Sequence, residues 1–244
     1  MDSSSIKCFS LNSWRDTDIK GQEYKHKLDH SAKKDQLKLI PLLALVTMVG
    51  IAYFVVGVGV LHFLRPDYNP VNHAVSNYAV GPFGYLMTSA FFVLALSVMT
   101  LAASLFFSIA LSNASQVAIL LLCLSSCGIV VMAIFPGDAH ALHPPVTTTG
   151  VIHWAAAAFS FLCIMVAAFL LASSFKTEER FQRFQQLCLV LAMAMVGALM
   201  LYGVLALVGW VGIGQRIYLV ISLLWLFLLA MWIWSSSRRQ QADQ

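Results

Sequence analysis

Between Asp67 and Asp138 the chain has seventy consecutive residues without a formal charge. Over all 244 residues only 11% are charged and 59% are hydrophobic, whereas about 25% charged residues is usual in soluble domains. Such a chain cannot cover a core with a polar surface. A soluble enzyme, a nucleic-acid-binding domain and a disordered protein are therefore excluded, and a polytopic membrane protein remains.

Six apolar segments are each long enough to cross a bilayer, which takes about 20 residues. They cover approximately 40–62, 84–111, 115–135, 148–172, 187–209 and 217–234. Because lipid offers no partner for open backbone groups and no period-two alternation is present, we expect helices, not a barrel. The predicted fold is an all-α bundle of six transmembrane helices over 39–235. We expect a polar, disordered tail at 1–38 and a short tail at 236–244.

Lysine and arginine predict the orientation, because they gather on the cytoplasmic side of a membrane. With the N-terminus inside, thirteen of the 15 lie on the inner side, and only Arg65 and Arg216 lie outside. We therefore expect both termini in the cytoplasm and the plasma (inner) membrane as the location. The expected partners are membrane lipids, with no nucleic acid.

Most histidines lie in the predicted outer loops or at the adjoining helix ends. These are five of the seven, namely His62, His73, His140, His143 and His153. No ionisable Asp, Glu, Lys, Arg or His falls at mid-membrane depth, which argues against a proton-coupled transporter or pump. Transport of a neutral solute stays open, and haem binding is disfavoured because the inner half has no histidine pair.

The first outer segment is expected to contain a short amphipathic helix near 70–80, lying in the membrane interface. Asn69 is a good N-terminal cap, Pro70 suits the first helical position, and Gly81 followed by proline would stop the helix.

His73 and Ser76 would share the polar face of this short helix. Three residues apart, they could approach each other as a base and a nucleophile would need. The alternative is that the helix simply turns this polar face to water.

The second outer segment carries Asp138, His140 and His143, and His153 lies in the opening turns of the fourth span. Asp and His ligands suit zinc, whose catalytic sites have three protein ligands and one open position. Asp138, His153 and His73 are the stronger candidate ligands, and His140 and His143 the weaker ones. Histidines in a proline-rich loop can also be solvated only. His153 shares a helix face with small residues that would let another helix come close.

The third outer segment, 212–216, is expected to be a glycine-containing turn that opens the last span, and it ends in Gln215 and Arg216. The forked guanidinium of Arg216 could bind a lipid phosphate or a substrate carboxylate. Alternatively it could pair with Asp138 or Asp67. We favour pairing, because an unpaired guanidinium near hydrocarbon is costly.

Three short motifs beside the spans resemble a known family. They are His73-Ala-Val-Ser76-Asn77-Tyr78, Phe135-Pro-Gly-Asp138 and Gly150-Val-Ile-His153. Together with six spans they are similar to the bacterial and archaeal membrane proteins grouped as domain of unknown function nine-nine-eight. The resemblance covers about 40–235 and implies a fold but little chemistry.

A more distant similarity is to the membrane hydrolases that include alkaline ceramidases and progestin-receptor-like proteins. It implies that Ser76, Asp138 and His153 stand around zinc. That superfamily has seven spans and a histidine pair on its last helix, whereas residues 217–234 contain no histidine.

The most specific functional hypothesis is an outward-facing site that acts on a lipid or amphiphile, with metal-assisted hydrolysis as its chemistry. The catalytic candidates are His73, Ser76, Asp138 and His153, and the substrate-binding candidates are Asn77, Tyr78, Gln215 and Arg216. Zinc is the candidate cofactor. The alternatives are a non-enzymatic scaffold or interaction protein and a carrier of a neutral solute or lipid.

Overall fold

The computed structural model describes residues 36, 38–109, 111–138, 145–176 and 182–242, without the side chains of 182 and 183. Residues Met1–Leu39 form one unit, of which it describes only the start of a helix, and Ile40–Gln244 form a second. Six helices in these residues are long and apolar enough to cross a membrane, and no strand occurs among them. The helices are Lys38–Leu64, α2 (Gly84–Ser108), α3 (Asn113–Ile134), α4 (Thr148–Ser174), α5 (Gln182–Leu207) and α6 (Val211–Ala242). The prediction of a multi-pass, all-α membrane protein is confirmed.

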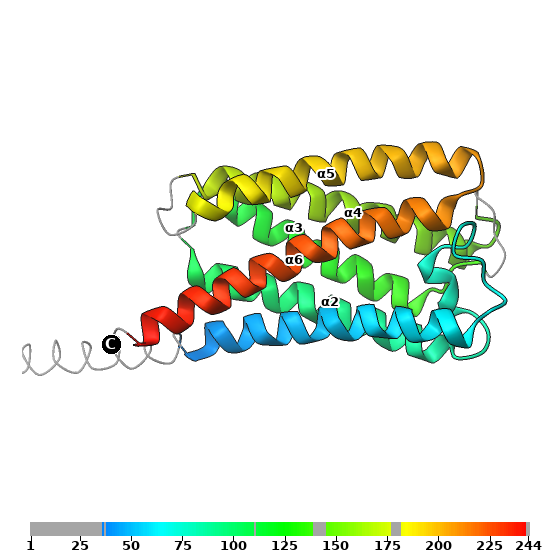
Figure 1. Ribbon diagram of the computed structural model, residues 1–244, viewed down its shortest axis with the longest axis horizontal. Helices are drawn as coiled ribbons and strands as arrows, with labels where there is room; N and C mark the ends of the chain where they lie inside the picture. Colours follow the sequence, from blue (N-terminus) through cyan, green and yellow to red (C-terminus); the bar gives the residue numbers. More distant parts are fainter. Residues whose placement is uncertain (1–35, 37, 110, 139–144, 177–181, 243–244) are drawn as a thin grey trace, which may run out of the picture. The chain divides into compact units, whose positions relative to one another are not determined.

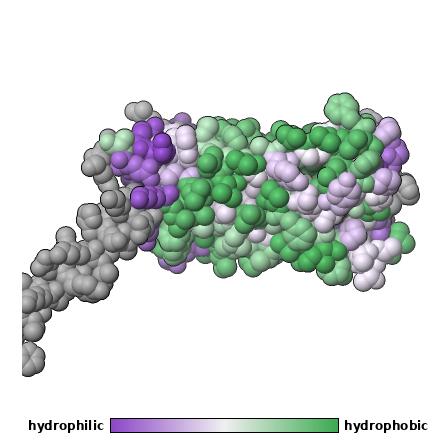
Figure 2. Space-filling view, turned by 90° about the horizontal axis from the view of Figure 1, so that it is seen from below, coloured by the Kyte–Doolittle hydropathy of each residue, from purple (hydrophilic) through white to green (hydrophobic). Residues whose placement is uncertain are grey.

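The helices of the second unit lie side by side along the bundle (Figure 1). Consecutive helices from α2 to α6 pack against one another, and α6 also contacts α2. The first helix packs on α2, where the Thr47 hydroxyl donates to the Ser97 carbonyl at 3.1 Å. Apolar side chains cover the middle of the face drawn in Figure 2, as contact with lipid requires.

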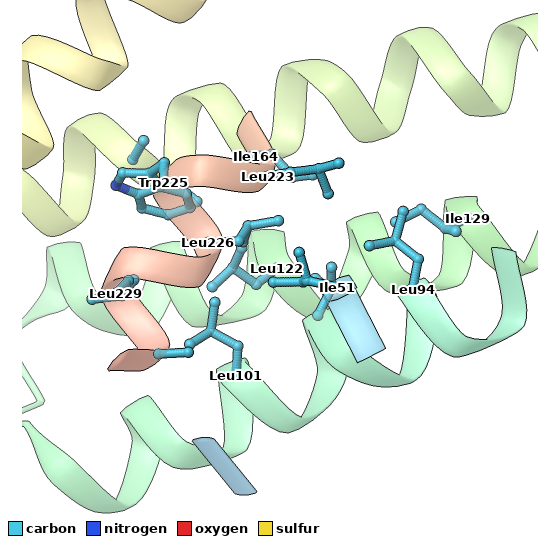
Figure 3. Packing of buried hydrophobic residues seen from close by; sticks show 14 of the residues in the cluster. Ile51, Leu94, Leu101, Leu122, Ile129, Ile164, Leu223, Trp225, Leu226 and Leu229 are labelled. Carbon is cyan, nitrogen blue, oxygen red and sulfur yellow. The ribbon is translucent and has the colours of Figure 1, made fainter. Parts of the chain in front are cut away.

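The interior is filled by aliphatic and aromatic side chains. Figure 3 shows Leu101, Leu122 and Leu226 pointing toward one another from α2, α3 and α6, with Trp225 beside α4. Trp225 is fully buried. Packing of this kind between helices, and not a hydrophobic driving force, holds helices together within lipid.

At one end of the bundle the first helix, α3 and α5 finish and α2, α4 and α6 begin. We call it the His153 end, made of 65–83, 135–138, 145–153 and 208–216. The charge count assigns it to the outside of the membrane, and that orientation stays a prediction.

The short helix expected near 70–80 is present as a single 3₁₀ helix, η1 (Val75–Ala79). It does not turn a polar face to water, because Ser76, Asn77 and Tyr78 are all buried in it. The expected N-terminal cap, Asn69, closes only a turn. Its Oδ1 accepts from the Val71 N–H at 2.8 Å, and the extended backbone before η1 ends that turn.

Arg65 fixes the segment between the first helix and α2. Its Nη1 donates to the carbonyl oxygens of Val80 at 2.7 Å and Pro82 at 2.9 Å, while Nε and Nη2 bind Asp67. The guanidinium also lies over the Tyr68 ring, 4.3 Å from its centroid. Asp67 raises the pKa of Arg65, so the side chain stays charged at every accessible pH. The segment is therefore held against the bundle by a cation.

The last helix begins six residues earlier than expected. Gly212 to Arg216 read as a glycine-containing turn, but α6 starts at Val211 and this stretch is helical. Gly209, with φ of +80°, turns the chain between α5 and α6 instead. Gly212 is needed in the helix because a Cβ there would collide with the carbonyl oxygens of Pro70 and His73.

Candidate functional site

The His153 ring connects α4 to the end of α3. Its Nδ1 lies 2.8 Å from the Phe135 carbonyl oxygen and 3.2 Å from that of Met132. Since carbonyl oxygens only accept hydrogen bonds, Nδ1 carries the proton and donates it. The last carbonyls of a helix have no partner within it, so His153 caps α3 from its neighbour.

The second nitrogen of this ring is the notable atom of the site. His153 is 5% exposed, and its Nε2 is buried with no hydrogen-bond partner among the described residues. With Nδ1 protonated, a neutral imidazole presents a lone pair at Nε2. A buried acceptor without a partner costs about 1–3 kcal/mol. A bound donor would remove that cost.

Asp138 differs from Nε2 of His153, because its carboxylate is an acceptor that already has hydrogen-bond donors. Its carboxylate accepts from the Val146 N–H at 2.7 Å and from both the backbone N–H and the hydroxyl of Thr147. The Thr147 hydroxyl and then the Val146 N–H lower the pKa of Asp138. A carboxylate before the first turn of α4 also suits the helix dipole.

Gly150 leaves the space that this carboxylate occupies. A Cβ at Gly150 would lie 2.5–2.6 Å from the carboxylate atoms of Asp138. The small residues on the His153 face, Gly150 among them, were expected to let another helix come close. Gly150 instead makes room for Asp138, which lies in the segment that follows α3. Two of the family motifs therefore interlock, through Phe135 with His153 and Asp138 with Gly150.

A polar cavity of about 60 Å³ lies beside His153. Its walls come from η1, the 135–138 segment, α4, α5 and α6, and include Ser76, Asn77, His153, Tyr202 and Gln215. Asp138 also lines it. The space holds several waters or a small polar group.

An apolar cavity of about 30 Å³ adjoins the polar one. It extends into the bundle between the first helix, α2, α3, α4 and α6, and five of its lining residues are labelled in Figure 3: Leu94, Ile129, Ile164, Leu223 and Leu226. Ser76 and Gln215 line both cavities. The two residues therefore stand where a polar chamber changes into an apolar one.

Two neighbours on α6 attach the η1 segment to the bundle. The Gln215 Oε1 accepts from the Val75 N–H at 2.6 Å. Arg216 Nη1 donates to the carbonyl oxygens of Pro70 at 2.8 Å, His73 at 2.9 Å and Gly212 at 3.0 Å.

The favoured pairing of Arg216 with an aspartate is wrong. Asp67 binds Arg65, and Asp138 binds the start of α4. Nη1 of Arg216 binds backbone carbonyls instead, which sequence cannot indicate because every residue carries one.

The structure brings five of the candidate site residues to one cavity. They are Ser76, Asn77, Asp138, His153 and Gln215. His140 and His143 lie outside the described residues.

Three candidates lie outside the cavity lining. The His73 Nδ1 accepts from the Asn69 N–H at 2.9 Å, with its ring edge on Tyr68. Tyr78 also packs on Tyr68, and Arg216 holds the loop. The proposed pair of His73 as base with Ser76 as nucleophile is therefore not arranged around the polar cavity.

Among the described residues no three His, Cys, Asp or Glu side chains converge as a metal site requires. Asp138 and His153 border the same cavity, and a zinc site there would need a third ligand from elsewhere. Zinc binding stays a prediction.

Tyr202 and Trp154 line the polar cavity but were not expected to. Tyr202 lies in an apolar span and has no neighbouring polar residue that could single it out. Trp154 directly follows His153, and that adjacency was the only available signal.

A family model matches residues 48–232, and it describes a protein of unknown function, DUF998. The match covers most of the chain, and the resemblance expected from the three motifs is confirmed. Neither the curated proteins nor the solved structures contain a significant match. The more distant similarity to alkaline ceramidase-like hydrolases gains no support from these comparisons.

Proposed function

Since this chain belongs to the DUF998 family, whose description assigns no activity, we propose a function from the geometry at the His153 end. The bundle binds a membrane amphiphile, with the polar head in the polar cavity and the apolar part directed into the apolar one. The observation that carries the proposal is the buried Nε2 of His153, a residue of the polar cavity, which has no hydrogen-bond partner in the described part of the chain. The site faces outward, following the lysine and arginine count.

A scaffold has no use for the Nε2 lone pair. Burying an acceptor without a partner lowers stability, and a packed apolar residue of similar volume would avoid that cost. A ligand hydroxyl or N–H that donates to Nε2 recovers it. Nδ1 of the imidazole therefore serves the fold, and Nε2 is left for a ligand.

The two cavities share lining residues, and this supports an amphiphile over a small polar solute. Ser76 and Gln215 border both, so a molecule with its head at His153 meets aliphatic walls next. Met132 is one of those walls, and an unbranched thioether side chain adapts readily to an incoming chain.

The same geometry supports a more specific function, which is hydrolysis of the bound amphiphile. A histidine base is usually oriented by a third group at its other nitrogen, and the Phe135 carbonyl holds Nδ1–H of His153 in that way. Nε2 would take a proton from water as the water oxygen bonds to the carbonyl carbon of an ester or amide. The bond from that carbon to the leaving group then breaks, and the proton passes from Nε2 to the leaving group.

The test compares two substitutions at one position. His153→Asn keeps a donor near the Phe135 carbonyl but removes the ε nitrogen, whereas His153→Gln keeps an amide at the ε position. His62→Asn is the matched control, since His62 is absent from the linings of both cavities. Each protein is purified in mild detergent, and bound amphiphile is counted by native mass spectrometry and lipid extraction.

We expect bound amphiphile in the wild type and the His62 control, with occupancy reduced about tenfold in His153→Asn, because one hydrogen bond is worth about 1–1.5 kcal/mol. Equal occupancy in His153→Asn and the wild type would refute the proposal. Stable protein without bound amphiphile would favour the scaffold. Metal analysis of the same samples tests zinc, and metal-free protein with unchanged hydrolysis would eliminate the metal-assisted form.

A further inference from the structure

Resting on the proposed function, we infer that the ligand's head group is uncharged and carries a hydroxyl, as in a monoacylglycerol, and is not a phosphate or carboxylate. Holding an anionic head group was one of the two roles that the sequence left open for Arg216, and an uncharged head group removes it. The donors, acceptors and charges that the described residues leave available at the polar cavity favour such a head group.

Both arginines at the His153 end bind backbone carbonyls of the protein, and the lining of the polar cavity contains neither of them. Arg65 binds Asp67 and two backbone carbonyls, and it is only 4% exposed. Arg216 donates to three backbone carbonyls, among them that of His73. An anionic head group would therefore enter without a cation from these two residues to balance it.

Among the described residues that line the cavity, the formal charge is negative. Asp138 is a cavity residue, and its lowered pKa keeps it ionised at neutral pH. An anion beside it would be repelled. A cation would be attracted by the same charge, but a quaternary ammonium has no hydrogen to donate to Nε2 of His153.

The hydrogen-bonding inventory also selects a hydroxyl. Nε2 of His153 needs a donor, which an ionised phosphate or carboxylate lacks. The Gln215 Oε1 is occupied by the Val75 N–H, so it does not compete for that donor. Ser76 borders the same cavity, and its hydroxyl can donate as well as accept. A ligand hydroxyl can thus donate to Nε2 and accept from Ser76.

The test uses three probes that share one oleoyl or oleyl chain and differ in head group. They are 1-monooleoylglycerol, oleoyl lysophosphatidic acid and a trimethylammonium amphiphile. Saturable binding to the full chain is measured in nanodiscs of neutral lipid by competition against a photoactivatable monoacylglycerol. His153→Asn, His153→Gln, Ser76→Ala and the control His62→Asn are compared with the wild type.

We expect the monoacylglycerol to bind at least tenfold more tightly than either charged probe. His153→Asn and Ser76→Ala should weaken it about tenfold and several-fold, while His153→Gln should restore part of the loss. Tighter binding of lysophosphatidic acid or of the trimethylammonium probe would overturn the inference but leave the proposed function standing. If no probe binds saturably to the wild type, the proposed function itself fails.

Discussion

The segment between the first helix and α2 depends on Arg65, and the structure indicates which of its contacts carry the stability. Nη1 binds the carbonyl oxygens of Val80 and Pro82, Nε and Nη2 bind Asp67, and the guanidinium covers the Tyr68 ring. The Asp67 side chain is 57% exposed, whereas the Arg65 side chain is 5% exposed. We predict that the carbonyl contacts, and not the ion pair, hold this segment.

The magnitudes separate two substitutions. Hydrogen bonds from a charged group contribute about 1.5–3 kcal/mol each, and water will replace part of this at the exposed Pro82. The contact with Tyr68 adds about 0.5–1 kcal/mol. Arg65→Met should therefore cost about 2–4 kcal/mol. Asp67→Asn should cost less than about 1 kcal/mol, because exposed ion pairs contribute little.

Thermal unfolding in detergent can be followed with a thiol-reactive dye, since Cys163 and Cys188 are buried. At about 2–4 °C per kcal/mol for a chain of this size, Arg65→Met should lower Tm by about 5–15 °C and Asp67→Asn by less than about 4 °C. Arg65→Lys keeps the charge without the fork and should fall between them. The reasoning is refuted if Asp67→Asn is as damaging as Arg65→Met, or if Arg65→Met leaves Tm unchanged.

Two further predictions concern the start of α4. Because the pKa of Asp138 is lowered in the folded protein, its contribution is complete above about pH 3.9 and is lost as the pH falls through the lowered value. Asp138→Asn should therefore reduce Tm at pH 7 and flatten the acid side of a Tm-against-pH profile, and an unchanged profile contradicts this. Gly150→Ala should lower stability by about 1–2 kcal/mol, because its Cβ displaces the Asp138 carboxylate. In an Asp138→Ala background the same substitution should stabilise by up to about 1 kcal/mol through helix propensity, and destabilisation in both backgrounds would exclude the clash.

The six spans could be predicted because lipid imposes a length and a composition that the sequence displays directly. The start of α6 could not, because Gly212 and Gly214 have the composition of a turn. Glycine is needed at both positions of the helix because other parts of the chain approach the helix too closely for a side chain. A Cβ at Gly214 would lie 2.7 Å from the ring of Tyr202. Close approach of this kind is a property of the packed bundle and has no local signal.

The sequence indicated which residues belong to the candidate site, but not which groups they contact. Asp138 and His153 stood out as ionisable groups beside long apolar runs. Asp138 lies against Gly150, and His153 binds the carbonyl of Phe135 at the end of a helix. No sequence pattern indicates that a glycine or a backbone carbonyl has such a role. Arg216 was assigned to an anion for the same reason, since backbone acceptors cannot be read from a sequence.

The hydrogen bond from His153 to the end of α3 would couple the proposed ligand to that helix. A donor bound at Nε2 would draw electron density across the ring and so strengthen the hydrogen bond from Nδ1 to the Phe135 carbonyl. The terminal peptide groups of α3 would then respond to ligand binding with no side chain changing its place. The vibrational frequency of an isotope-labelled Phe135 carbonyl would report whether the cavity is filled.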